Sequence, residues 1–146
     1  MALAMDAATL NAFLATDFAQ VAPDFVIESA NDDVLIARLR VSDAHLRPGG
    51  TVSGPSMFGL ADLAIYTAIL SHIGPVALAV TTNASIDFIR KPESGRDLLA
   101  HCRLLKLGRV LAVGEALIYS EGVKDPVARC SMTYSIPSKR PGNGGL

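Results

Sequence analysis

The chain has 146 residues, 50% of them hydrophobic, which suits one compact domain with a substantial core. Its 13 basic and 14 acidic residues leave a formal net charge of -1, which argues against nucleic acid or an anionic membrane as the main partner. The N-terminal segment carries Asp6 and Asp17 where a secretory signal needs an apolar core. We therefore expect a cytoplasmic protein whose ligand is a small molecule.

The predicted elements begin with a helix and a β-hairpin. Helical spacing of apolar residues predicts a first helix over residues 6–21, which Pro23 ends. The β-rich runs 25–30 and 34–41 flank the turn residues Asn31-Asp32-Asp33, and together they predict a hairpin.

A long apolar helix is predicted next, over residues 56–73, with Pro55 at its first position and Gly74-Pro75 at its end. It has hardly any polar face, so it should be buried nearly all round. The apolar run falls short of the roughly 20 residues that a membrane span needs, and Asp62 and His72 interrupt it. A core helix is the better interpretation.

Four β-rich runs complete the predicted domain, and their short links favour antiparallel pairing; they cover residues 76–89, 97–107, 110–120 and 127–136. An antiparallel sheet wrapped around the long helix gives an α+β domain over residues 1–136. Residues 137–146 lack core-forming side chains and predict a disordered tail. One small sheet covers only one side of the helix, so we expect a second copy of the chain on the other side.

Asp62 is the one acid in an otherwise almost wholly apolar stretch, GGTVSGPSMFGLADLA. Burying a carboxylate costs several kcal/mol unless it is compensated. The helix offers no basic residue three or four positions away. A structural role is the alternative, but an uncompensated buried acid favours a catalytic one.

The turn Ser53-Gly54-Pro55-Ser56 is the second candidate, because unpaired N–H groups gather where a helix begins. Gly54 can approach a carbonyl closely, which suits an oxyanion hole; a simple capping turn is the alternative. Eight residues of helix separate Gly54 from Asp62 by about 12 Å. One acyl carbonyl cannot meet both within one chain, so a working site would be shared between two chains.

Other reactive residue types have weaker support. Ser53 is a candidate catalytic hydroxyl, but the sequence has no G-x-S-x-G elbow for a serine hydrolase. A structural role is the favoured interpretation for each of the three histidines, which are His45, His72 and His101. The two cysteines lie far apart without paired Cys/His spacing, which predicts buried reduced thiols and no metal site.

Several motifs resemble the hotdog-fold acyl-CoA thioesterases of the phenylacetate-degradation (PaaI-like) family over residues 25–136. They are HLRPGGTVSG before the long helix, LADLA within it, VTTNASIDFIRKP after it, then LLKLGR and VARCSMTYSI. The resemblance implies Asp62 as general base or nucleophile, the Gly54 N–H as oxyanion-hole donor, and the Thr81 hydroxyl near the acid. It also implies a homodimer or dimer of dimers, with each site built from two subunits and no cofactor.

The chain departs from the family pattern at two places. Ser53-Gly54-Pro55 stands where the family usually has His-Gly-Gly, and Arg47 replaces a common asparagine. Arg47 either polarises the carbonyl, binds phosphate, or is a solvated loop charge. By resemblance, Arg90, Lys91 and Arg109 are candidates for the phosphates of coenzyme A, although strand-end basic residues are usually only solvated.

The predicted reaction is therefore hydrolysis of an acyl-CoA thioester to free acid and coenzyme A. A non-catalytic acyl-CoA-binding dimer is the main alternative, because the turn at Gly54 is altered. A dehydratase is disfavoured, since its catalytic histidine near the helix start is missing.

Overall fold

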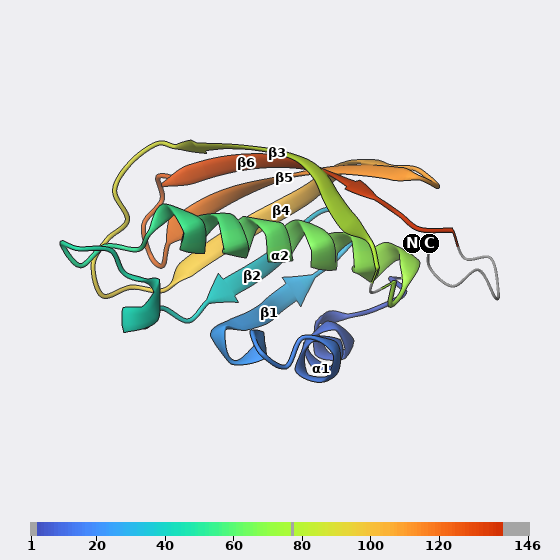
Figure 1. Ribbon diagram of the computed structural model, residues 1–146, viewed down its shortest axis with the longest axis horizontal. Helices are drawn as coiled ribbons and strands as arrows, with labels where there is room; N and C mark the ends of the chain where they lie inside the picture. Colours follow the sequence, from blue (N-terminus) through green and yellow to red (C-terminus); the bar gives the residue numbers. More distant parts are fainter. Residues whose placement is uncertain (1–2, 77, 139–146) are drawn as a thin grey trace.

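The computed structural model describes residues 3–76 and 78–138, and it confirms the predicted hotdog fold (Figure 1). A six-stranded antiparallel sheet lies against one long helix, with a second helix near the N-terminus. The elements in chain order are α1 (Ala7–Asp17), η1 (Ala22–Asp24), β1 (Phe25–Ala30), β2 (Leu35–Leu39), η2 (Asp43–His45), α2 (Gly54–Ile73), β3 (Val80–Phe88), β4 (Leu98–Leu107), β5 (Leu111–Ser120) and β6 (Ala128–Ser135).

The strand order is β1-β2-β4-β5-β6-β3, and every pair is antiparallel. The β1–β2 hairpin therefore pairs with β4, while β3 lies at the opposite edge beside β6. The four last strands are antiparallel as predicted, but β3 is not the neighbour of β4. This crossover pairs the strand that follows α2 with the last strand, β6, so that Thr81 lies opposite Tyr134.

Helix α2 lies across the sheet and supplies much of the core (Figure 1). It begins at Gly54, two residues earlier than predicted, because the side chain of Ser53 caps it by accepting from the Ser56 N–H. It ends before Gly74, whose φ of 93° is one that glycine adopts readily. Its length and composition would suit a membrane span, yet 61% of its most apolar window is buried within the protein, as in a core helix.

The burial of α2 is not complete. Its C-terminal half is almost wholly buried, whereas the N-terminal half leaves one stripe half-buried or exposed, made of Phe58, Gly59, Asp62 and Leu63. These positions recur at a spacing of three to four residues, so they share one face of the helix. The catalytic candidate therefore lies on a face of α2 that the sheet covers only in part.

Two predicted boundaries were wrong by four residues. The first helix ends at Asp17, not at residue 21, because Phe18 leaves the helical conformation and the chain tightens into η1, which contains Pro23. The strand predicted to start at residue 76 starts at Val80. The segment before it forms a turn in which Ala79 N–H donates to Val76 O at 3.2 Å, so these backbone groups are not available to the sheet.

Candidate active site

Asp62 lies in the middle of α2 and borders a pocket of about 500 Å³. The pocket wall is mostly apolar and comes from α1 and the segment after it, from α2, and from residues of the strands β1, β3 and β6. Its described lining contains no other charged residue. The pocket thus brings one carboxylate against a surface that suits an apolar group.

Two hydroxyl groups bind the carboxylate of Asp62. Thr81 Oγ1 donates a hydrogen bond of 2.8 Å to Oδ1. The hydroxyl of Tyr134 donates to the same Oδ1, and it also lies 3.1 Å from the Asp62 backbone oxygen. Thr81 is the residue that the family resemblance placed near the acid.

Tyr134 is the site residue that sequence reasoning missed. It projects from β6 toward α2 and is only 3% exposed. Burial, together with the charge of Asp62, raises the pKa of Tyr134, so its hydroxyl keeps its proton and remains a donor. Two signals pointed to it: alternation puts Tyr134 on the buried face of its strand, and a buried tyrosine hydroxyl needs a partner.

The turn at the start of α2 leaves one backbone donor free. The Ser56 N–H donates to Ser53 Oγ at 3.3 Å, and the Met57 N–H donates to Ser53 O at 3.1 Å. Pro55 has no N–H. Within the described part of the chain the Gly54 N–H has no acceptor, so it is available to a ligand at the positive end of the helix.

Ser53 itself acts as a helix cap in this structure. Its hydroxyl accepts from the Ser56 N–H and donates to the Ser56 hydroxyl at 3.0 Å. His45 is the histidine of the preceding loop, but its ring contacts Ser42 and Asp24 instead of Ser53. The described residues thus provide no base for a serine nucleophile.

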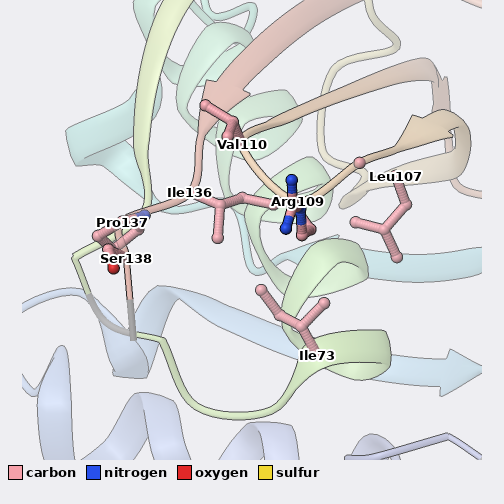
Figure 2. Close-up of a pocket in the computed structure, with 8 residues that line it drawn as sticks. Ile73, Leu107, Arg109, Val110, Ile136, Pro137 and Ser138 are labelled. Carbon is pink, nitrogen blue, oxygen red and sulfur yellow. The ribbon is translucent and has the colours of Figure 1, made fainter. Parts of the chain in front are cut away.

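The four basic candidates lie at two ends of α2. Arg47, Arg90 and Lys91 are exposed near its N-terminal end, where the Phe88 ring lies beside Gly54. Arg90 donates to Pro126 O at 2.7 Å. Arg109 belongs to the β4–β5 link and lies near Ile73 at the other end of α2 (Figure 2).

Arg109 borders a second hollow of about 910 Å³, and the described residues that line it include no carboxylate. Helix α2 has 20 residues, so its two ends lie about 30 Å apart. Arg109 therefore does not join the other three basic candidates within one chain. Over residues 3–76 and 78–138, no group of three His, Cys, Asp or Glu side chains is placed to hold a metal.

Comparison with known proteins adds a family match. The model of the thioesterase superfamily matches residues 49–127, which run from the loop before α2 to the end of the β5–β6 link. A protein of Pseudomonas aeruginosa provisionally named as an esterase is 30% identical over 115 residues, which cover 79% of this chain and 84% of the relative.

Solved structures agree with this match. A protein of Silicibacter sp. TM1040, provisionally described as a thioesterase, is 58% identical, with a TM-score of 0.88 and coverage of 94% of this chain and 96% of its own. A variant of the phenylacetic acid degradation protein PaaI from Thermus thermophilus is 25% identical, with a TM-score of 0.68 and coverage of 82% of this chain and 98% of its own.

Proposed function

The chain belongs to the thioesterase superfamily, and from this premise we propose that it hydrolyses acyl-CoA thioesters with Asp62 as the catalytic carboxylate. The observation that carries the proposal is the position of Asp62, a carboxylate held by two hydroxyl donors at the edge of an apolar pocket. Such a pocket suits the acyl group of a thioester, and the acid beside it suits the reacting carbon.

Two routes are open to this carboxylate. As general base, Asp62 removes a proton from water while the water oxygen bonds to the thioester carbon; the carbon–sulfur bond breaks and the departing sulfur takes up the proton. As nucleophile, an Asp62 oxygen bonds to that carbon and expels the thiolate, and water then hydrolyses the mixed anhydride. Both routes consume one water and release one acid and one thiol.

Gly54 is proposed to stabilise the oxyanion that forms on the thioester carbonyl. Its free N–H lies at the start of α2, where the helix dipole adds positive charge. Asp62 lies eight residues further along the helix, about 12 Å away. The proposal therefore includes a site in which Gly54 comes from one protomer and Asp62 from its partner.

The exposed surface favours this pairing of protomers. Phe58 on α2 is 36% exposed, and on the edge strand β3 Val80 and Phe88 are 55% and 53% exposed. Phe58 and Val80 lie on the side of Asp62, and Phe88 lies beside Gly54.

Three basic side chains at the N-terminal end of α2 are proposed to contact the phosphates of coenzyme A. They are Arg47, Arg90 and Lys91. Arg109 lies too far away to join them in the same chain.

A steady-state assay on acyl-CoA thioesters of short, medium and aryl acyl groups tests the proposal, with coenzyme A release as the readout. We expect turnover without added metal, and a fall of on the order of a hundredfold or more for Asp62→Asn. The Asn variant should fold, since it removes a half-buried charge while keeping the side-chain size. Binding of acyl-CoA by wild type without turnover would instead identify a non-catalytic binding dimer.

A further inference from the structure

The two oxygens of the Asp62 carboxylate have different surroundings. Oδ1 accepts hydrogen bonds from both Thr81 and Tyr134, whereas no described residue donates to Oδ2. On the basis of the proposed function, we infer that Tyr134 is a positioning residue: together with Thr81 it fixes Oδ1, so that Oδ2 is the oxygen that acts on water or on the thioester carbon.

The sheet register explains how both hydroxyls reach one oxygen. Thr81 of β3 and Tyr134 of β6 are direct partners in an antiparallel pair, so their side chains project from the same face of the sheet, toward α2. The register shifts between Thr81 and Asn83, next to this pair. Such bulges re-aim side chains and are frequent beside active sites.

The Tyr134 side chain is held at its ring and at its hydroxyl group. Its ring stacks on Tyr66 of α2 at a centroid distance of 6.0 Å and an interplanar angle of 29°. The same hydroxyl lies 3.1 Å from the backbone oxygen of Asp62, which fixes it relative to the helix as well as to the carboxylate. A hydroxyl donor held in this way fixes the orientation of the Asp62 carboxylate.

The two donors affect both the direction and the reactivity of the acid. A carboxylate oxygen that accepts two hydrogen bonds has its lone pairs engaged, while its partner oxygen keeps its own available. Loss of one donor should therefore reduce the population of correctly oriented Asp62.

The test compares Tyr134→Phe, Thr81→Val and the double variant with wild type, using an acyl-CoA that wild type hydrolyses. Each single variant should lower kcat on the order of 10- to 100-fold with little change in KM, as expected for the loss of one hydrogen bond to a charged group. Tyr119→Phe is the matched control, because the Tyr119 ring packs at a tilted angle against His101, on the sheet face that points away from α2.

The outcomes separate the inference from the proposed function. A folded Tyr134→Phe with wild-type kcat, alongside an inactive Asp62→Asn, overturns the inference alone. A wild type that hydrolyses no acyl-CoA overturns both. If Tyr134→Phe does not fold by circular dichroism, Thr81→Val decides, because it removes the other donor to Oδ1. An unchanged kcat in a folded Thr81→Val variant counts against the inference.

Discussion

Asp62 is stabilised by neutral donors instead of a cation. Among the residues that the structure describes, no Lys, Arg or His forms an ion pair with it, and its hydrogen bonds come from Thr81 and Tyr134. A cation against the carboxylate would neutralise its charge in the ground state. Hydroxyl donors orient the group while leaving it negative, which suits a base or a nucleophile.

The two cysteines should be inert in the native protein. Cys102 and Cys130 are buried free thiols, and burial raises their pKa values to about 12 and about 11. A thiol reagent such as DTNB at pH 8 should label neither until the chain unfolds, and then both. Because the folded pKa of Cys102 exceeds its ordinary value of 9.0, ionisation also favours unfolding, so stability should fall as pH rises above about 9. Rapid labelling of the folded protein would contradict this burial.

Single residues differed in how well the sequence predicted them. Asp62 and Gly54 each break a local pattern, an acid in an apolar helix and a glycine before a helix-starting proline, and both stood out. Tyr134 fits its strand pattern and resembles any core aromatic residue. Its partner depends on the β3–β6 register and on the packing of α2, which are long-range features that local sequence does not encode.

At the scale of elements, α1 forms one wall of the Asp62 pocket. Leu14 and Phe18 line the pocket, and the Phe18 ring packs edge-on against Tyr66 at 5.5 Å. This helix lies before the matched family region, which begins at residue 49. We therefore expect α1 to limit the size of the acyl group.

Phe18→Ala should enlarge the pocket and shift the preference toward longer acyl chains. One methylene in a hydrophobic pocket changes discrimination by about 10- to 200-fold, so the ratio of kcat/KM for a long against a short acyl-CoA should rise by at least several-fold. Phe13→Ala is the matched control, because Phe13 packs on Phe18 at 6.1 Å but does not line the pocket. An equal change in the kcat/KM ratio in Phe18→Ala and Phe13→Ala would mean that the effect comes from destabilisation of α1 and not from pocket size.

The predicted start of β3 failed because the chain turns before the strand begins. Val76 and Ala79 read as strand residues, but Gly74 turns the chain and the segment bonds to itself before β3 begins at Val80. The place of β3 beside β6 likewise follows from the path of α2 across the sheet, since that path carries the chain past β4 to the far edge. Apolar alternation predicted the strands themselves because it depends only on which face is buried.

At the scale of the whole molecule, the two parts of the proposed site do not meet within one chain. The free Gly54 N–H and the Asp62 carboxylate lie at different points along α2, on a face with exposed apolar side chains. A two-fold axis across this face would place the acid of each protomer near the turn of its partner, giving two equal sites per dimer. Mutual burial of Phe58, Val80 and Phe88 would stabilise that pair.

Purified heterodimers test this central claim most directly. One protomer carries Asp62→Asn and the other Gly54→Val, whose side chain crowds the turn because a Cβ there lies 3.2 Å from Phe88 Cζ. Each homodimer should be inactive, while the heterodimer should recover about half of wild-type turnover, since one of its two sites has both halves intact. A heterodimer of one wild-type protomer and one Asp62→Asn protomer should also keep about half of wild-type turnover, and it serves as the control. No recovery in verified mixed dimers, with the control active, would contradict a site shared across the interface.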